Sequence, residues 1–347
     1  MNINILPDFL SIVPSEDLSR TWPANRTIML RITSKQIKDI IDKKYFPTFI
    51  YLKNIKPVDI NFIINRLLTL VTTCQIISLD LPDFDMNLRF EKFKEILSKC
   101  KLNKLSLYNN NLGDTEIESI SEILSRQSKG KCSVLNLANN KITEIGFKSL
   151  LKILNNGQRI DLNLCNNKIG YEYERVKSIE LCSTLENLNL CYNQISNVDI
   201  DKILLHNIEL KSLDLSQNQI TTFNFNISQN NIFILENLNL SYNRIDTEGA
   251  KSLSKILVKC KILKKLNLSY NHICTEGAIS IIEQCSSLSR IYLASNMITD
   301  DSMDKFSQVL IQRTFLTYIT LNGNMISKDI IDNLIKVLGY RVKIIYL

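Results

Sequence analysis

Side chains suited to catalysis are few and far apart in this sequence of 347 residues. The two histidines, His206 and His272, lie in different segments, so no Ser-His-Asp arrangement can be traced around either. A glycine-rich phosphate loop, an H-E-x-x-H motif and a C-x-x-C motif are all missing from the sequence. We therefore expect a protein that is not an enzyme and that has no catalytic residue, no cofactor and no metal site.

Two cysteines could do redox chemistry or bind a metal. Cys165 and Cys191 each lie two residues before an asparagine of the repeat described below. Neighbouring parallel strands would hold their Cα atoms about 5 Å apart, within reach of a disulfide. The interpretation that we favour is a tolerated pair of small residues in a reducing compartment, and a redox or metal role is the alternative. The cysteines expected in the core are Cys74, Cys100, Cys132, Cys182, Cys260 and Cys285.

A repeat of the form L-x-x-L-x-L-x-x-N-x-[LI] must position these side chains. Its L-x-L alternation predicts a short strand with one buried face, and its asparagine is expected to satisfy backbone groups where the chain leaves the strand. Helical periodicity follows the turn in segments such as Thr143–Leu154, Thr247–Val258 and Asp300–Leu310, with Thr or Asp at the expected N-cap. The repeat asparagines are Asn110, Asn140, Asn167, Asn193, Asn218, Asn243, Asn271, Asn296 and Asn324.

Alternation of strand and helix at this period predicts parallel strands joined by crossovers. Because helices are wider than strands, the stack should curve, with a concave sheet inside and helices on the convex side. The fold class is therefore α/β, a leucine-rich-repeat solenoid shaped like a horseshoe.

The triplets Glu248-Gly249-Ala250 and Glu276-Gly277-Ala278, each followed by an apolar helix, make residues 100–347 similar to the ribonuclease-inhibitor-like class of leucine-rich repeats. That class includes inhibitors, GTPase-activating proteins of nuclear transport, and effectors that intracellular bacteria deliver into host cells. The chain is rich in Ile, Asn and Lys, whose codons are A/T-rich, and poor in Ala, so it most resembles the bacterial effectors. The resemblance implies a virulence function, exercised by binding a host protein in the host cytosol.

The pattern divides the chain into three parts. Residues 101–347 carry regular repeats and end in one more strand, at Val342–Leu347. Residues 27–100 keep only degenerate repeats, with strand cores at Ile28-x-Leu30, Ile50-x-Leu52 and Ile77-x-Leu79, and residues 1–26 are expected to form an amino-terminal cap. An apolar edge strand at the carboxyl end needs cover. We favour cover by Tyr340, Arg341 and Lys343 together with the preceding helix, and the alternatives are a partner or a role as secretion signal.

Side chains just before and between the last two leucines of each repeat should line the concave surface. The column between the leucines is Ser106, Asn136, Asn163, Asn189, Asp214, Asn239, Asn267, Tyr292 and Thr320. The column before them is Lys104, Val134, Asp161, Asn187, Ser212, Asn237, Lys265, Arg290 and Tyr318. In the middle repeats these residues are short and polar, and we favour mutual hydrogen bonding of their amides as the explanation.

In the carboxy-terminal repeats the two columns instead carry larger aromatic and basic residues, namely Lys265, Arg290, Tyr292 and Tyr318. Tyr242 and Tyr270 flank them at the turn. Aromatic residues and arginine on a rigid surface are typical of protein-binding hot spots. We predict that these six residues bind a partner, the alternative being ordinary exposed side chains.

Charge and hydropathy narrow the kind of partner. The 42 basic and 35 acidic residues leave a net charge of +7, which is too dilute over this length to indicate nucleic-acid binding. Basic side chains beside tyrosines suit an acidic protein partner.

No apolar run reaches the roughly 18 residues of a membrane span. Residues 1–18 lack the basic start of a secretory signal peptide. We expect a cytoplasmic monomer that can enter a host cell without a cleaved signal.

Two other functions stay open. A GTPase activator is suggested by the nuclear-transport proteins of the same class, although their acidic carboxy-terminal tail is missing here and the chain ends RVKIIYL. A substrate adaptor for a ubiquitin ligase would need a ligase-docking box, and Leu6-Pro7 with Trp22 is only faintly similar to an F-box.

Overall fold

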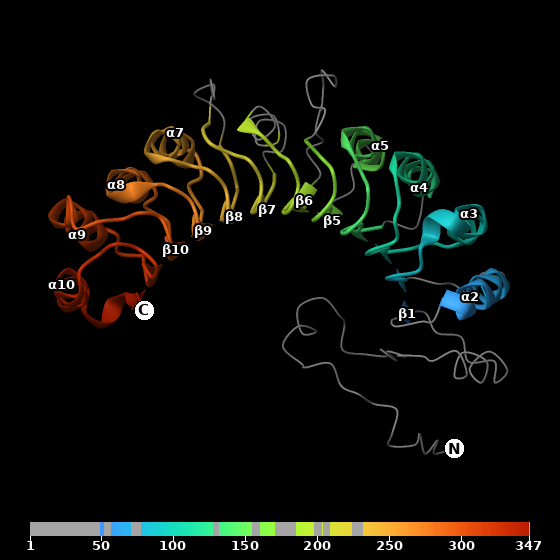
Figure 1. The fold of residues 1–347 in the computed structure, drawn as a ribbon. Helices are drawn as coiled ribbons and strands as arrows, with labels where there is room; N and C mark the ends of the chain where they lie inside the picture. The colour runs from blue at the N-terminus through green and yellow to red at the C-terminus, as the bar shows by residue number, and fades with distance from the viewer. Residues whose placement is uncertain are drawn as a thin grey trace, which may run out of the picture.

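A single curved sheet runs through the protein. The computed structural model describes residues 49–51, 57–70, 78–127, 132–154, 160–170, 185–197, 203, 209–223 and 232–346. In this part of the chain twelve strands follow one another in chain order, and every neighbouring pair is parallel. Figure 1 shows an arc with the strands on its inner side. The predicted horseshoe with a concave parallel sheet is confirmed.

The strands are short, most of them three residues long. They are β1 (Phe49–Tyr51), β2 (Ser78–Asp80), β3 (Lys104–Ser106), β4 (Val134–Asn136), β5 (Ile160–Asn163), β6 (Leu185–Asn189), β7 (Ser212–Asp214), β8 (Asn237–Asn239), β9 (Lys265–Asn267), β10 (Arg290–Tyr292), β11 (Tyr318–Thr320) and β12 (Lys343–Ile345). The last residue but one of each strand from β2 to β11 is a leucine or isoleucine that points into the core; Leu238, for example, is 2% exposed.

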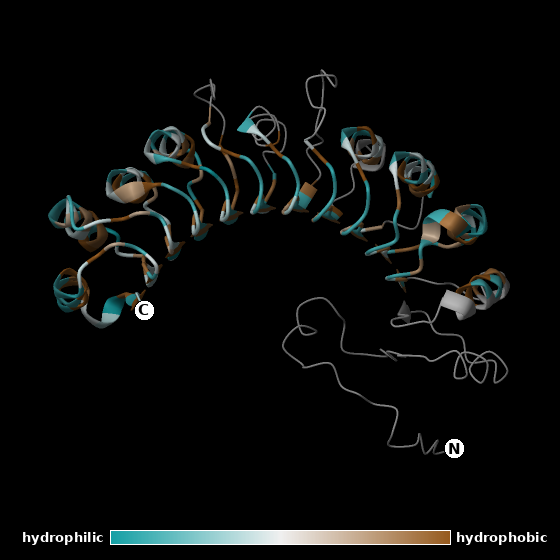
Figure 2. Cartoon of the chain, viewed as in Figure 1, coloured by the Kyte–Doolittle hydropathy of each residue, from teal (hydrophilic) through white to brown (hydrophobic). Residues whose placement is uncertain are grey.

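Helices cover the convex side of the sheet, as predicted (Figure 1). They are α2 (Pro57–Leu70), α3 (Phe90–Lys99), α4 (Asp114–Arg126), α5 (Glu144–Leu154), α7 (Thr247–Leu257), α8 (Cys274–Gln284), α9 (Met303–Gln312) and α10 (Lys328–Leu338). Short 3-10 helices, η2 (Met86–Arg89) and η4 (Gly339–Arg341), precede α3 and follow α10. The helices are two-toned in Figure 2, hydrophobic on one side and hydrophilic on the other. One apolar core, from Ile60 to Val342, lies between the two layers.

The repeat asparagine is structural, as its position predicts. Asn218 is buried, and its Nδ2 donates to the carbonyl oxygens of Leu190, Leu215 and Ser216 at 3.0, 3.0 and 3.1 Å. Its Oδ1 accepts from the N–H of Ile195 in the preceding repeat at 2.9 Å. One side chain therefore closes the turn of its own repeat and joins it to the previous one.

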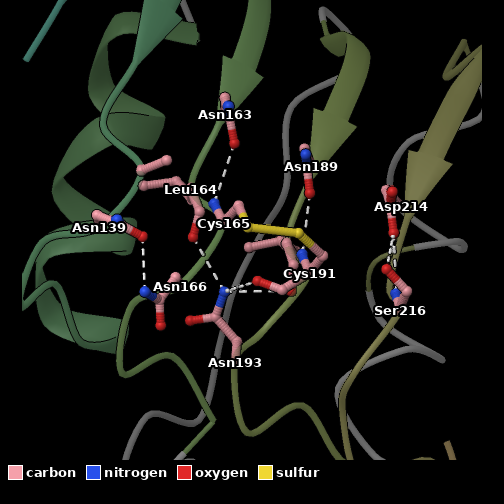
Figure 3. Close-up of a disulfide and its surroundings, with 12 residues drawn as sticks. Asn139, Asn163, Leu164, Cys165, Asn166, Asn189, Cys191, Asn193, Asp214 and Ser216 are labelled. Carbon is pink, nitrogen blue, oxygen red and sulfur yellow. Dashed lines mark hydrogen bonds between the residues drawn. A yellow bond between two sulfur atoms is a disulfide. The ribbon is translucent and has the colours of Figure 1, made fainter. Parts of the chain in front are cut away.

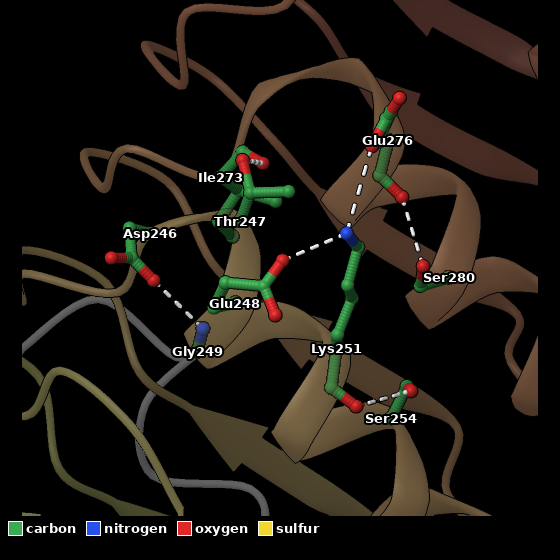
Figure 4. A network of polar contacts seen from close by, with 9 residues as sticks. All are labelled: Asp246, Thr247, Glu248, Gly249, Lys251, Ser254, Ile273, Glu276 and Ser280. Carbon is green, nitrogen blue, oxygen red and sulfur yellow. Dashed lines mark hydrogen bonds and ion pairs between the residues drawn. The ribbon is translucent and has the colours of Figure 1, made fainter.

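Small residues allow the helices of neighbouring repeats to approach closely. A Cβ atom at Gly249 would lie 2.0 Å from the carbonyl oxygen of Thr221, and one at Gly277 would lie 2.9 Å from the Cβ of Ala250. The Glu-Gly-Ala triplets therefore mark tight packing of α7 and α8 against the preceding repeat. On the outer surface Lys251 bridges these helices, with its Nζ 2.8 Å from Glu248 and 3.6 Å from Glu276 (Figure 4).

One of the three expected N-caps is confirmed, because Thr143 directly precedes α5 and its hydroxyl accepts from the N–H of Ile145 at 3.2 Å. The other two need correction by one or two residues. Asp246, not Thr247, caps α7, and its carboxylate accepts from the N–H of Gly249 at 2.7 Å (Figure 4). The Thr247 hydroxyl instead donates to the carbonyl of Ile273 in the next repeat at 3.0 Å. The helix expected from Asp300 begins at Met303. Asp300 accepts from the N–H of Ser327, so it also serves the following repeat rather than its own helix.

The two ends agree with the predicted strands in part. The strand cores around Ile50 and Leu79 are present as β1 and β2, and the final strand is present as β12. Residues 1–26, predicted as a cap, and the strand core at Ile28-x-Leu30 lie outside the described residues. The expected cover of β12 by Tyr340 is wrong, because this side chain is fully exposed. Arg341 turns away to donate to the carbonyls of Arg313 and Leu310.

Candidate functional site

The concave surface has the two columns that the repeat predicts. Pairing in register aligns Lys265, Arg290 and Tyr318 on β9, β10 and β11, and continues to Lys343 on β12. The second column runs in the same way through Asn267, Tyr292 and Thr320. Because one strand follows the next about 4.8 Å away, side chains of one column from adjacent strands can touch.

In the second column, the asparagines and the aspartate from β4 to β9 serve the backbone. The side-chain oxygen of each accepts from the N–H two residues later, as Asn189 does from Cys191 at 3.0 Å and Asp214 from Ser216 at 2.9 Å (Figure 3). The same bond is made by Asn136, Asn163, Asn239 and Asn267. Such Asx turns need a short side chain with an acceptor. Tyr292 occupies the same position and cannot make this bond.

Amide bonding between neighbours, as predicted, accompanies these turns. Asn239 donates to Asp214 at 3.0 Å, Asn136 to Ser106 at 3.4 Å, and Asn187 to Asp161 in the first column. The polar residues of the middle strands are thus satisfied within the sheet, which supports their interpretation as structural.

Cations beside the middle strands are also paired. Lys211 lies 2.5 Å from Glu186, and Lys264 lies 2.7 Å from Glu236. The hydrogen bond and charge of Lys264, with a smaller contribution from Lys211, hold the pKa of Glu236 below its usual value. These paired charges form a row one residue before the first concave column and largely cancel one another along that row.

The carboxy-terminal strands differ in that their cations face tyrosines instead of acids. The Nζ of Lys265 lies 5.4 Å from the ring centroid of Tyr292, whose ring is 5.4 Å from that of Tyr318 at an interplanar angle of 50°. Arg290 is exposed beside them, and no described acidic side chain forms an ion pair with either cation. Lys265, Arg290, Tyr292 and Tyr318 therefore form one cluster, the concave patch.

Lys343 belongs beside the concave patch and was missed by sequence reasoning. It pairs in register with Tyr318 and is exposed. The signal was available, because the predicted terminal strand places Lys343 one residue before a core isoleucine, as Arg290 and Tyr318 are placed. The column therefore carries three cations across β9, β10 and β12.

The other two predicted site residues form a separate pair. Tyr242 and Tyr270 stack with ring centroids 4.1 Å apart and planes at 9°, at the turns that follow β8 and β9. The Tyr270 hydroxyl raises the pKa of Tyr242, chiefly by hydrogen bonding. Both side chains are nearly half exposed. No described ring or cation–π contact joins this pair to the concave patch.

The described cysteines include one bonded pair and several buried thiols, whereas Cys74 and Cys182, which were expected in the core, lie outside the described residues. Cys165 and Cys191, half exposed and with Cα atoms 4.6 Å apart, form a disulfide between neighbouring repeats (Figure 3). The favoured interpretation of an unpaired couple is therefore wrong, although the predicted proximity is right. Cys132, Cys260 and Cys285 are buried free thiols, as expected of core positions. Burial raises the pKa of Cys132 and of Cys260 to about 12, so neither is a reactive thiolate at neutral pH.

Metal binding and membrane insertion find no support in the described part of the chain. No group of three or more His, Cys, Asp or Glu side chains there could hold a metal ion. His272 lies exposed at a turn, and His206 falls outside the described residues. Within the same residues, no helix combines the length and apolar character needed to cross a bilayer.

The chain is similar to known leucine-rich-repeat proteins both in sequence and in structure. A family model of the leucine-rich repeat matches residues 206–222, 234–254 and 259–281. A leucine-rich-repeat protein of Leptospira interrogans aligns with 92% of this chain and 70% of its own, at 22% identity and a TM-score of 0.56. The repeat, the parallel sheet and these matches identify a leucine-rich-repeat solenoid.

Two Listeria monocytogenes structures are more distant. Internalin C2 covers 83% of this chain and 96% of its own at 19% identity, with a TM-score of 0.41. The internalin InlF covers 83% and 93% at 15% identity, also with a TM-score of 0.41. Comparison with curated protein sequences finds no match.

Proposed function

We propose that this protein is a non-enzymatic binding scaffold that holds an acidic protein partner on its concave patch. Leucine-rich-repeat solenoids are protein-interaction scaffolds, and the present one is a rigid sheet backed by a continuous core. A preformed surface loses little conformational entropy on binding, so a small cluster of anchor residues is enough for affinity. The protein acts as a monomer in this proposal.

The observation that carries the proposal is the difference in charge pairing between the concave patch and the row of residues that immediately precedes the first concave column. In that row Lys211 and Lys264 are neutralised by glutamates, whereas Lys265 lies over the ring of Tyr292 and Arg290 pairs in register between Lys265 and Tyr318. A cation over an aromatic ring remains available to a carboxylate, because the ring contributes no negative charge of its own. Tyrosine and arginine at the centre of such a surface are the residue types that dominate binding energy.

We propose further that the partner is a host protein and that this chain is an effector of an intracellular bacterium, acting in the host cytosol. The support is the resemblance to effectors of the ribonuclease-inhibitor-like class and the codon-biased composition. Because the cytosol is reducing, this location predicts that the Cys165–Cys191 disulfide of the structure is reduced to two thiols there. Differential alkylation of the protein recovered from host cells tests the location, and a pair found oxidised there would argue against it.

The binding proposal is tested by affinity capture from a eukaryotic cytosolic lysate followed by measurement of Kd with the purified partner. The patch variant is Lys265→Ala, Arg290→Ala, Tyr292→Ala, Tyr318→Ala. We expect it to weaken binding by about 100-fold or more, since hot-spot residues contribute roughly 2 kcal/mol or more each. Wild-type affinity should also fall as salt is raised.

The matched control removes two cations that are already paired, Lys211→Ala with Lys264→Ala. This control changes the net charge as much as removal of Lys265 and Arg290 does, so we expect its affinity to stay within a few-fold of the wild type. Circular dichroism confirms that each variant is folded. A partner retained equally by the patch variant, or lost equally from the control, would move the binding site away from the concave patch.

A further inference from the structure

The turns that follow the strands form a second surface, which lies along the edge of the concave sheet. We call it the turn ridge and define it by the residues immediately before and after the repeat asparagines from Asn140 to Asn324. The residue before each asparagine has a left-handed backbone, with φ between 53° and 68°. These residues are Asn139, Asn166, Tyr192, Gln217, Tyr242, Tyr270, Ser295 and Gly323.

At its amino-terminal end the ridge has the residues that this conformation favours. Asparagine tolerates a left-handed backbone, and the side chains of Asn139 and Asn166 are used within the ridge. Asn166 donates to Asn139 at 2.6 Å, and Asn139 donates to the Tyr108 hydroxyl at 2.7 Å. Local structure explains this end fully.

Along the middle of the ridge, local structure does not explain the residues. Tyr192, Tyr242 and Tyr270 adopt the same left-handed backbone, which bulky side chains disfavour, and their exposed fractions are 57%, 48% and 45%. Neither backbone preference nor burial selects tyrosine here. Stacking accounts for Tyr242 with Tyr270, but no described ring contact involves Tyr192. Residues held at an unfavourable backbone conformation without a packing role are typical of functional sites.

The residues after the asparagines add apolar and basic groups to the same surface. Arg244 and His272 are exposed beside the tyrosines, and Met297 and Met325 follow, 48% and 62% exposed. Met297 also has a left-handed backbone, with φ of 58°. The complete column is Lys141, Lys168, Gln194, Gln219, Arg244, His272, Met297 and Met325. Neither ridge column contains an acidic residue.

We propose that the turn ridge is a second protein-binding surface, distinct from the concave patch, and that it takes a polypeptide segment whose apolar side chains are flanked by carboxylates. The tyrosines and methionines supply the apolar contacts, and methionine adapts its shape to irregular partners. Arg244, together with the lysines further along the ridge, attracts carboxylates, and neither ridge column has an acidic side chain of its own. This proposal does not depend on the concave patch.

The probe for the test is a displayed library of random linear peptides, selected on the full-length wild type. Enriched peptides are synthesised, and their Kd is measured by fluorescence polarisation. The ridge variant is Tyr192→Asn, Tyr242→Asn, Tyr270→Asn, in which each tyrosine becomes the residue that the same column has at Asn139 and Asn166. We expect peptides rich in apolar residues and Asp or Glu, and a loss of roughly tenfold or more in affinity for the ridge variant.

Three further variants keep the result interpretable. Tyr340→Asn removes a fully exposed tyrosine outside the ridge and should leave affinity unchanged. Tyr242→Gln with Tyr270→Gln repeats the test with the residue found at Gln217, in case the asparagine variant does not fold. The quadruple patch variant should still bind the selected peptides. Its failure to do so, with the ridge variant unaffected, would place the site on the concave patch and overturn the ridge. Selection of no peptide that depends on the ridge would overturn it as well.

Discussion

The amino-terminal and carboxy-terminal halves of the solenoid are built on one backbone plan but use their surface side chains differently. In the first half, amides such as Asn139 and Asn166 at the turn bond to neighbouring side chains, and Asn163 on the sheet closes an Asx turn. In the second half, Asp214, Asn239 and Asn267 still close Asx turns, but Tyr242 and Tyr292 take the place of amides in the same two columns and are left partly exposed. The backbone requirements are the same in both halves, so they cannot explain the change of residue type.

This difference separates side chains that hold the fold together from those available to a partner. Removing a side chain that hydrogen-bonds to the backbone should lower the free energy of unfolding markedly. Removing a side chain that occupies the same position but makes no such bond should change stability little and should weaken binding of a partner. The halves therefore predict opposite responses to substitution, and each experiment below measures one side of that contrast.

The largest effect at neutral pH is expected at a buried repeat asparagine. Asn218→Ala leaves the N–H of Ile195 without a partner and removes the Nδ2 hydrogen bonds to the carbonyls of Leu190, Leu215 and Ser216, each of which keeps one other donor. At about 1 to 3 kcal/mol for the unpaired N–H and about 1 kcal/mol for each of the two Nδ2 hydrogens, the free energy of unfolding should fall by about 4 kcal/mol. Urea unfolding monitored by circular dichroism measures it. Asn237→Ala, an exposed substitution one repeat later, is the control and should cost less than about 0.5 kcal/mol. Equal losses in both would contradict the structural assignment of the repeat asparagine.

The disulfide should give the next largest effect. Cys165 and Cys191 are 26 residues apart, and closing a loop of that length restricts the unfolded chain by about 3.5 kcal/mol. Reduction of the wild type should lower the free energy of unfolding by that amount. A Cys165→Ser, Cys191→Ser variant should start at the reduced value and show no response to reductant. Similar curves for oxidised and reduced wild type would mean that the bond contributes nothing to stability.

The buried thiols of the second half should respond to alkaline pH where the disulfide does not. Burial raises the pKa of Cys260 from 9.0 to about 12 and raises that of Cys285 in the same direction. Above pH 9 the unfolded state loses protons that the native state retains, so the stability present below pH 9 is lost as pH rises towards 12. The loss should approach about 1.4 kcal/mol per pH unit for each thiol.

Comparison with a Cys260→Ala, Cys285→Ala variant isolates this contribution from the titration of lysines and tyrosines. The variant is less stable at pH 7 because it loses buried volume, but its stability should fall less steeply between pH 9 and pH 11. Denaturant unfolding at several pH values gives both slopes. Parallel slopes would show that the two thiols ionise as easily in the native protein as in the unfolded chain.

Sequence reasoning reached the strands and columns because the repeat is strictly periodic. Once Leu266 and Ile291 are placed in the core, alternation puts Lys265 and Arg290 on the concave face. It missed the N-cap because Asp246 and Thr247 are adjacent cap formers, and only the bond to Gly249 distinguishes them. The Asx turns had a signal that was overlooked, an Asn or Asp followed two residues later by Ser, Cys or Ala.

Other features depend on contacts between repeats that periodicity does not encode. The separation of Tyr242 and Tyr270 from Tyr292 follows from which rings stack, and ring packing depends on rotamers. The pairing of Cys165 with Cys191 depends on redox conditions as well as proximity. Spacing alone could therefore predict that these groups lie close together, but not which of them bond.

The smallest effect tests the contrast most directly, by exchanging the residue types of the two halves at one column of the turn ridge. Tyr192→Asn places asparagine at a left-handed position with φ of 54°, and relief of backbone strain should leave stability unchanged or raise it by up to about 1 kcal/mol. Asn166→Tyr should lower it by about 1 to 2 kcal/mol, because it introduces that strain and removes the bond to Asn139. Thermal unfolding compares the two. A destabilised Tyr192→Asn variant would mean that this tyrosine supports the fold after all, and the contrast between the halves would then be one of packing.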